Sequence, residues 1–341
     1  MTTGIILSNI GSPDSTSVSD VRRYLAQFLM DPRVIDLPFL LRFLIVYCFV
    51  LPFRPRKSAE AYKSVWLENG SPLVVYTQNL ASKLEAKSDY PIELGMRYQN
   101  PSIESAVSNL LIKKPDLETI VLAPMFPHYA MSTTESIVVY TQKYLKKHYP
   151  TINLKVLYSY YNDPEYINAL HLSMADYLKD YDHILFSYHG VPVRHLTKTD
   201  PTCYTCYKLH DCCHAGGPEA HTTCYKAQTV KTTELLVKKA SIPDDKWSIS
   251  YQSRLGKDPW IEPATDDTLE ALGKKGVKKL LVMCPAFVTD CLETLEEIAI
   301  EGKEEFIENG GESFTYIPCL NSQTPWVDYL ANKLNKLISH D

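Results

Sequence analysis

Residues 4–13, GIILSNIGSP, and residues 183–192, HILFSYHGVP, share the pattern that decides the fold. Each is an apolar run typical of a buried strand, followed by Ser-x-x-Gly-x-Pro. Residues 121–135, VLAPMFPHYAMSTTE, and residues 282–296, VMCPAFVTDCLETLE, form a second matching pair, and the two motifs come in the same order each time. The sequence therefore predicts two related halves, each built around its own sheet.

Short apolar runs alternate with helical stretches along the chain, which predicts βαβ units and an α/β fold with parallel sheets covered by helices on both faces. We place the halves at residues 1–165 and 166–341. Because ligands bind beyond the carboxyl ends of parallel strands, we expect the active site in a cleft between the two halves. The expected strands cover residues 4–8, 91–96, 119–122, 153–157, 183–187, 247–251, 279–283 and 314–317.

Composition restricts the possible functions. With 341 residues and 45% hydrophobic side chains, the chain can bury full cores, and its net charge of −5 argues against a nucleic-acid surface. Neither G-x-G-x-x-G nor G-x-x-x-x-G-K-[ST] is present, so a nucleotide cofactor is not indicated. The N-terminus does not read as a signal peptide, so we expect a cytoplasmic protein whose cysteines stay reduced.

Residues 37–57 contain an apolar stretch, LPFLLRFLIVYCFVLPF, followed by the basic RPRK. Its uncharged run is too short to span a membrane. Two interpretations remain open, a buried core helix and an apolar lip that touches a membrane or a greasy ligand. The basic residues after the stretch favour the lip.

His189 ends an expected strand, and Glu293 follows another strand at the start of an expected helix. A histidine and a carboxylate at the mouth of one cleft can bind a divalent cation or move protons. Each also has an ordinary structural explanation, because strand-end histidines are often simply hydrogen-bonded and glutamates favour helix starts.

Eight long motifs occur along the chain: LSNIGSPDSTSVSDVRRYLAQFLMDPRVIDLP (7–38), ENGSPL (68–73), GMRYQNP (95–101), PMFPHYAMSTTES (124–136), SYHGVP (187–192), QSRLGKDPW (252–260), EPATDDTLEALGKKGVKKLLVMCPAF (262–287) and VTDCLETLEEI (288–298). Together they resemble the ferrochelatases, especially those of Gram-negative bacteria. They follow the family's own order over nearly the whole chain, so the resemblance implies two Rossmann-like, chelatase-type domains that enclose a porphyrin cleft.

By that resemblance His189 and Glu293 are the paired catalytic residues and the place where the substrate Fe²⁺ binds. Asp290 and Glu297 flank Glu293, and we expect them to continue an acidic path for metal or protons. The porphyrin-binding residues that the resemblance implies are Arg54, Tyr62, Ser71, Arg97 and Tyr98.

The implied activity is that of a lyase, ferrochelatase, which inserts Fe²⁺ into protoporphyrin IX to give protohaem and two protons, the last step of haem biosynthesis. A neutral His can accept protons near pH 7, and carboxylates can bind Fe²⁺ or relay protons, so the roles of the pair stay open. The alternatives are a chelatase for another tetrapyrrole, such as coproporphyrin III or a cobalt-accepting ring, and a non-catalytic haem- or metal-binding sensor.

Residues 202–224 form a cysteine-rich insert, TCYTCYKLHDCCHAGGPEAHTTC, where the family normally continues with a short Gly-Asp-Pro-Tyr segment. Such a density of cysteines in a reducing compartment indicates a metal site. Zinc and iron–sulfur clusters both accept four thiolates, and nearby histidines keep a mixed zinc site open. The insert holds five of the nine cysteines, Cys203, Cys206, Cys212, Cys213 and Cys224.

Some ferrochelatases carry a [2Fe–2S] cluster, and the insert resembles the internal cysteine loop of one variety. We therefore expect a [2Fe–2S] cluster on four of the five cysteines, with structural zinc as the alternative. Cys203, Cys206 and Cys224 are the firmer ligands, while Cys212 and Cys213 compete for the fourth position. The partners we expect are a porphyrin, ferrous iron and a peripheral contact with the inner membrane, and a homodimer is compatible with the sequence.

Overall fold

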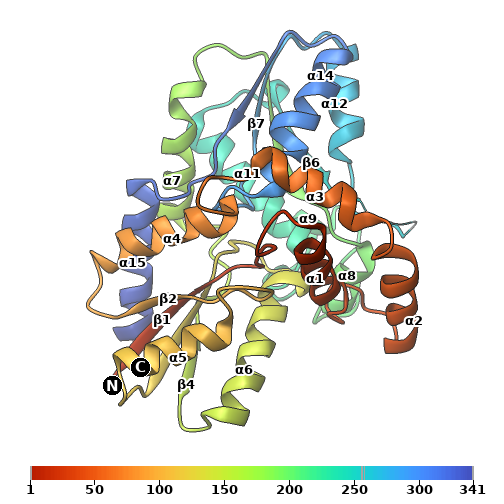
Figure 1. Cartoon of the computed structure of the whole chain (residues 1–341). Helices are drawn as coiled ribbons and strands as arrows, with labels where there is room; N and C mark the ends of the chain where they lie inside the picture. Colours follow the sequence, from red (N-terminus) through yellow and green to blue (C-terminus); the bar gives the residue numbers. More distant parts are fainter. Residues whose placement is uncertain (1, 255, 257, 340–341) are drawn as a thin grey trace. The chain divides into compact units, whose positions relative to one another are not determined.

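The computed structural model describes residues 2–254, 256 and 258–339 (Figure 1). The chain forms two compact units. The first contains Met1–Phe126, Met131–Tyr158 and Val327–Asp341, and the second contains Pro127–Ala130 and Ser159–Trp326. Neither unit is one continuous segment: most of the last helix belongs to the first unit, and Pro127–Ala130 belongs to the second.

The first unit has a four-stranded parallel sheet in the order β2-β1-β3-β4. The central strand β1 is fully buried, as its unbroken apolar run predicts for a parallel sheet covered on both faces. The strands are β1 (Thr3–Ser8), β2 (Ile92–Leu94), β3 (Thr119–Pro124) and β4 (Asn153–Val156).

The second unit repeats this arrangement with a parallel sheet in the order β6-β5-β7-β8. In both units the first strand in sequence lies between the second and the third, and the fourth forms an edge. The two-fold repeat and the parallel sheets expected from the sequence are thus confirmed. The strands are β5 (His183–His189), β6 (Trp247–Gln252), β7 (Lys279–Met283) and β8 (Ser313–Ile317).

Helices connect the strands. The first unit contains α1 (Val18–Leu29), α2 (Phe39–Leu44), the π-helix η1 (Ile45–Val50), α3 (Arg54–Val65), α4 (Pro72–Glu85), α5 (Ile103–Lys113), the π-helix η2 (Met131–Glu135) and α6 (Ser136–His148). The second contains α7 (Pro164–Met174), η3 (Ala175–Tyr177), α8 (Val193–Thr199), α9 (Cys212–Ala215), α10 (Pro218–His221), α11 (Tyr225–Ala240), η4 (Asp244–Lys246), α12 (Thr265–Lys274), α13 (Leu292–Leu295), the π-helix η5 (Glu297–Gly302) and α14 (Lys303–Glu308), and α15 (Thr324–Ser339) ends the chain.

The glycine of the repeated Ser-x-x-Gly-x-Pro motif allows a neighbouring loop to pass close to each first strand. A Cβ on Gly11, whose φ is +102°, would lie 2.0 Å from the carbonyl oxygen of Tyr98. At the equivalent Gly190 a Cβ would lie 2.9 Å from the carbonyl oxygen of Gln252. Only glycine fits such close backbone contacts, which explains why both halves keep it.

One expected helix is broken in the structure. The sequence pattern predicts a helix over residues 293–307, but the structure forms α13, then the π-helix η5, then α14. The Glu301 amide donates to the Glu296 carbonyl at 2.9 Å, an i→i+5 bond that widens the turn. π-bulges of this kind are frequent at functional sites.

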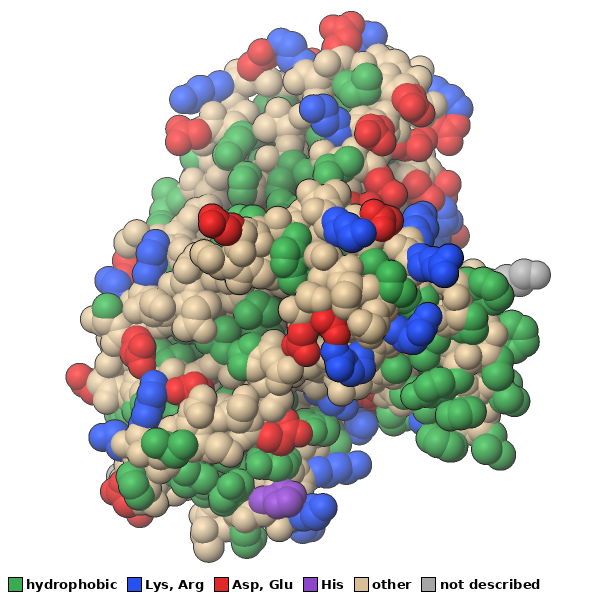
Figure 2. All heavy atoms as spheres, in the orientation of Figure 1, with side chains coloured by type: hydrophobic (Ala, Val, Ile, Leu, Met, Phe, Trp, Pro, Cys, Tyr) green, Lys and Arg blue, Asp and Glu red, His purple; other side chains and the backbone are tan. Residues whose placement is uncertain are grey.

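The apolar stretch at 37–57 is a lip, and the buried-helix interpretation is wrong. Figure 2 shows hydrophobic side chains gathered over α2. Leu40 at the start of the lip is 75% exposed, and Phe49 in η1 is 71% exposed. Arg42 is buried, as are Val46 and Leu51, and its guanidinium donates to the Leu37 carbonyl at 2.8 Å. None of the helices over the described residues combines the length and apolar character that a transmembrane segment requires.

Candidate active site

The carboxyl ends of β5 and β6 bring the site together in the second unit. His189 is the last residue of β5 and lies opposite Gln252, the last residue of β6. The Gln252 side-chain amide donates to the backbone carbonyl of Glu293 at 2.7 Å, while its oxygen accepts a bond from the buried Ser187 hydroxyl at 2.9 Å. Gln252 therefore links the strand pair that ends at His189 to the turn that carries Glu293.

The tautomer of the neutral His189 ring follows from a contact with the backbone. Its Nδ1 lies 2.6 Å from the Gly190 carbonyl oxygen. Because a carbonyl only accepts hydrogen bonds, Nδ1 carries the hydrogen, and in the neutral ring Nε2 is left with a free lone pair. The half-buried imidazole can then bind a metal ion or accept a proton through Nε2.

Glu293 stands in the first turn of α13, a helix of only four residues. A reciprocal cap holds the start of this helix. The Cys291 side chain accepts the Thr294 amide, and the Thr294 hydroxyl accepts the Cys291 amide at 3.0 Å. The cap fixes the turn on which the half-buried Glu293 side chain is mounted.

Glu297, one turn further on, interacts with both residues of the expected pair. Burial and the negative charge of Glu293 raise the pKa of Glu297, whereas a hydrogen bond from Ser253 and the charge of His189 act in the opposite direction. His189, Glu293 and Glu297 thus share one electrostatic neighbourhood, as expected for groups that handle a cation or protons.

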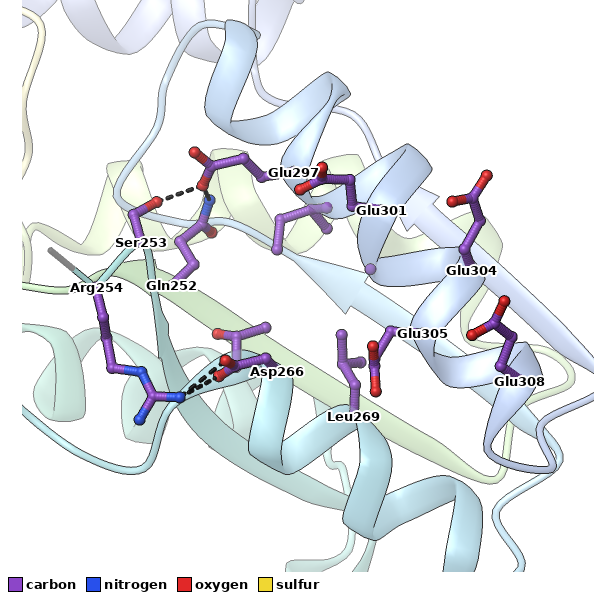
Figure 3. Close-up of a pocket in the computed structure, with 13 residues that line it drawn as sticks. Gln252, Ser253, Arg254, Asp266, Leu269, Glu297, Glu301, Glu304, Glu305 and Glu308 are labelled. Carbon is purple, nitrogen blue, oxygen red and sulfur yellow. Dashed lines mark hydrogen bonds and ion pairs between the residues drawn. The ribbon is translucent and has the colours of Figure 1, made fainter. Parts of the chain in front are cut away.

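A pocket with a volume of about 530 Å³ is lined at one end by Gln252, Ser253 and Glu297. Figure 3 shows the side chains that line it. Arg254 forms an ion pair with Asp266 at 2.8 Å at one side of it. The pocket carries more carboxylates than cationic groups, so its potential favours cations over anions. The acidic residues that line it are Asp266, Glu297, Glu301, Glu304, Glu305 and Glu308.

The five expected porphyrin contacts all lie in the first unit, and they differ in exposure. Arg54 is exposed at the start of α3, in the basic end of the lip. Tyr62 is 6% exposed and packs edge-to-face against Trp66. Ser71 is 5% exposed at the N-cap position of α4. Arg54 is therefore the most accessible cation among them.

Arg97 and Tyr98 belong to a buried polar network that the sequence analysis missed. Its centre is Asp31, which is 5% exposed and accepts bonds from Arg97 at 2.6 Å, Tyr98 at 3.0 Å and Ser136 at 2.6 Å. The Arg97 guanidinium also lies over the Tyr140 ring at 4.1 Å. The sequence offered only an Asp before Pro in a family motif, a signal too common to mark a buried hub.

Four of the five insert cysteines are grouped by the structure. A hydrogen bond between the thiols of Cys206 and Cys224 raises the pKa of Cys206 and lowers that of Cys224. Burial, together with the charges of Cys224 and Cys212, raises the pKa of Cys213 to about 12. Cys203 is exposed and takes no part in the interactions described for these four thiols.

Asp200 organises the start of the insert. Its buried carboxylate accepts the backbone amides of Thr202, Thr205 and Cys206, each at 2.9 Å. The Thr202 hydroxyl adds a bond at 2.6 Å. Burial opposes the charge of Asp200, but these hydrogen bonds lower its pKa to about 2. The loop before Cys206 is thus held by a single ionised side chain.

Neither region is arranged as a finished metal site. Over residues 2–254, 256 and 258–339, no three His, Cys, Asp or Glu side chains already have the mutual placement that holds a metal ion. The four thiols nevertheless provide the number and type of donors that a four-thiolate group needs. Their side chains would have to draw together on binding.

The fold is that of a chelatase. It resembles SirB from Bacillus subtilis with Fe³⁺, with a TM-score of 0.54, 12% identity and coverage of 99% of this chain and 96% of that chain. It also resembles the sirohydrochlorin chelatase SirB from Bacillus subtilis subspecies spizizenii in complex with cobalt, with a TM-score of 0.54, 13% identity and coverage of 99% and 95%. At these identities the likeness concerns the fold alone.

Sequence comparison identifies the family. The Ferrochelatase family model matches residues 2–337. The ferrochelatase of Pseudomonas fluorescens (strain Pf0-1) is 49% identical over 329 residues, which cover 96% of each chain. That of Opitutus terrae is 46% identical over 334 residues, covering 97% of this chain and 96% of the relative. The chain therefore belongs to the ferrochelatase family.

Proposed function

We propose that the chain inserts Fe²⁺ into protoporphyrin IX, giving protohaem and two protons, and that His189 and Glu293 are its catalytic pair. Membership of the ferrochelatase family makes it a lyase of haem synthesis that acts on a porphyrin and ferrous iron. One observation carries the assignment of the pair. His189 and Glu293 come from segments far apart in the sequence, yet Gln252, which lies opposite His189, donates to the Glu293 carbonyl at 2.7 Å and to the half-buried Glu297 carboxylate at 3.5 Å.

The chemistry of these groups suits metal insertion. Two pyrrole N–H bonds break as one Fe²⁺ enters the ring, so two protons must be accepted for each dication. His189 offers a free Nε2 lone pair, which can take a proton or bind iron. Glu293 and Glu297 repel each other, and a divalent cation beside them relieves that repulsion.

Porphyrin fluorescence tests this activity directly. Purified protein, kept anaerobic, is mixed with protoporphyrin IX or coproporphyrin III and then with Fe²⁺. Insertion quenches the fluorescence catalytically, over many turnovers per chain, with protoporphyrin preferred. A sensor would quench at most one equivalent, and a preference for coproporphyrin would assign the alternative substrate.

For the porphyrin itself, we infer that the exposed Arg54 guanidinium pairs with a propionate. Tyr62, Ser71, Arg97 and Tyr98 remain the other proposed contacts. Tyr62, Ser71 and Tyr98 are buried in the first unit, so they support the packing of that unit more readily than they offer new hydrogen bonds.

We propose that the cysteine-rich insert holds a [2Fe–2S] cluster, with structural zinc as the alternative. The residues fit such a group, because four thiols already share one neighbourhood and Asp200 holds the loop before Cys206. When bound, the cluster would supply a one-electron redox centre and a cross-link between the insert and α11. We propose Cys206, Cys212, Cys213 and Cys224 as the four ligands. This set departs from the expected one, in which Cys203 was a firmer ligand and Cys212 and Cys213 competed for one place, because Cys203 is exposed and outside the interactions of the other four thiols.

The test compares two cysteines of the same insert. Anaerobically purified protein should show the visible absorption of an iron–sulfur cluster, and metal analysis separates iron from zinc. Cys224→Ser should lose the bound metal, while Cys203→Ser, which alters an exposed thiol outside the group, should keep it. Loss of metal in Cys203→Ser with retention in Cys224→Ser would overturn this ligand set.

We also propose that the lip rests on a lipid bilayer. Its exposed apolar side chains are followed by the exposed cations Arg56 and Lys57, which complement anionic headgroups. Burying two large apolar side chains contributes about 3–6 kcal/mol, so removing both should weaken binding by about a hundredfold or more. The exposed lip residues are Phe39, Leu40, Leu41, Phe43, Leu44, Tyr47, Phe49 and Phe53.

Vesicle sedimentation tests the lip. The double variant Leu40→Ser/Phe49→Ser should stay in solution with vesicles of phosphatidylglycerol and phosphatidylcholine, whereas the unaltered chain sediments. Ile112→Ser is the matched control, since Ile112 is 78% exposed on α5. Equal sedimentation of all three would remove the lip from membrane binding. Light scattering on the same samples tests the homodimer that the sequence also allows.

A further inference from the structure

Asp290 lies two residues before α13, and both oxygens of its carboxylate accept hydrogen bonds inside the second unit. The residue is 3% exposed. Its Oδ1 accepts the Tyr316 hydroxyl at 2.5 Å and the Thr294 hydroxyl at 3.1 Å. Its Oδ2 accepts the Asn321 side-chain amide at 2.6 Å. Donors from three different segments therefore converge on this one carboxylate.

Asn321 pairs with Asp290 in both directions. Besides donating to Oδ2, its side-chain oxygen accepts the Asp290 backbone amide at 2.9 Å. The backbone amide of Asn321 in turn donates to the Val288 carbonyl at 2.8 Å. The φ of Asn321 is +47°, a backbone conformation that Asn tolerates better than most residues. The loop after β8 and the loop before α13 are thus joined by two reciprocal contacts.

Thr294 carries this anchoring to the catalytic turn. Its hydroxyl donates to Asp290, accepts the Cys291 amide at 3.0 Å, and sits one residue after Glu293. α13 is a single four-residue turn, and such a turn is not stable by itself. The position of Glu293 therefore depends on what holds the start of α13.

We propose that Asp290 is a positioning residue for Glu293 and not a step in an acidic path for metal or protons. The inference rests on the catalytic role proposed for Glu293. The oxygens of the Asp290 carboxylate already accept hydrogen bonds from Tyr316, Thr294 and Asn321. Those hydrogen bonds must break before the carboxylate can bind a hydrated cation or carry a proton. As an anchor, Asp290 keeps these hydrogen bonds, and they stabilise the geometry of the turn that carries Glu293.

The experiment perturbs the Asp290 network from two sides. Asp290→Asn keeps the size of the side chain but replaces one acceptor oxygen with an amide donor, so one of the hydrogen bonds from Asn321 or Tyr316 is lost, and Tyr316→Phe removes only the donor to Oδ1. Each single variant, the double variant and Glu293→Gln are assayed for Fe²⁺ insertion across pH. Tyr166→Phe is the matched control, because it removes a hydroxyl that donates to the Pro285 carbonyl at 2.7 Å in the same unit.

An anchoring role predicts that Asp290→Asn and Tyr316→Phe each lower kcat/KM for the metal by about tenfold or more. The double variant should fall no further than the weaker single variant, because both break one unit. In both single variants the apparent pKa values of the pH–rate profile should not change, and the porphyrin KM should change less than about twofold. The control Tyr166→Phe should retain the unaltered rate.

A path role predicts a different result. Asp290→Asn would then be inactive or would shift a pH limb, while Tyr316→Phe would keep the unaltered rate, and that outcome overturns the proposal. An equal loss in Tyr166→Phe would overturn it as well, since the effect would be general. If Asp290→Asn does not fold, Tyr316→Phe alone decides. Full activity in Glu293→Gln would instead refute the proposed catalytic pair.

Discussion

Replacing Asp31 by Ala should strongly destabilise the first unit. The Asp31 carboxylate is 2% exposed and forms an ion pair with Arg97 at 2.6 Å, and the Arg33 amide adds a bond at 2.8 Å. Breaking a buried, hydrogen-bonded ion pair by removing one partner costs about 3–5 kcal/mol. At about 2–4 °C per kcal/mol for a domain of this size, the melting temperature should fall by roughly 6–20 °C.

The pH dependence of this effect has a definite sign. Burial opposes the charge of Asp31, but bonds from Ser136 and the Arg33 amide and the charge of Arg97 lower its pKa below the unfolded value of 3.8. A lowered pKa stabilises the folded state above pH 3.8, and that contribution disappears as the pH falls through the folded value. The difference between the unaltered chain and Asp31→Asn should therefore be full at pH 7 and shrink in acid.

Calorimetry on the unaltered chain, Asp31→Ala and Asp31→Asn measures both effects. Glu60→Gln is the control, because it breaks only an exposed pair with Lys63 and should leave the melting temperature within about 1 °C. A fall of less than about 2 °C in Asp31→Ala, or a difference that grows in acid, would refute the reasoning about the buried network.

Three further predictions follow from single contacts. Arg54→Ala should raise the porphyrin KM severalfold and largely keep kcat, measured by fluorescence, whereas an unchanged KM would remove Arg54 from propionate binding. Asp200→Asn should speed proteolysis within residues 202–224 without affecting cleavage elsewhere, and equal cleavage patterns would contradict its role in the loop. Gly190→Ala should destabilise the second unit by about 1–3 kcal/mol, because its Cβ would lie 2.9 Å from the Gln252 carbonyl oxygen, and unaltered stability would show that the backbone yields there.

The sheets could be predicted from the sequence because buried parallel strands leave a simple signal. The apolar runs that end at Ser8 and Ser187 are unbroken, and each is followed by the glycine that the neighbouring loop requires. The match between the two halves then indicated one topology used twice, and both sheets follow it. Local sequence was sufficient here because the central strands β1 and β5 are buried on both faces.

Other features depend on contacts between distant residues. The π-helix at Glu297–Gly302 follows from how its turn is held, which helical periodicity does not encode. Asp31 gains its importance from partners that come more than 60 positions later in the chain, such as Arg97. The apolar neighbours of Cys48 predict a core position, but Cys48 is exposed on the lip. Apolar neighbours in the sequence cannot distinguish a buried core position from a position on an exposed apolar surface.

The catalytic pair is tested most directly by the rate of anaerobic Fe²⁺ insertion into protoporphyrin IX in His189→Ala, compared with the unaltered chain. If the His189 ring takes a proton or binds the entering iron, its loss should reduce kcat by about a hundredfold or more, while the protein stays folded and still binds porphyrin. A variant that inserts iron at the unaltered rate would show that the imidazole has no part in the reaction.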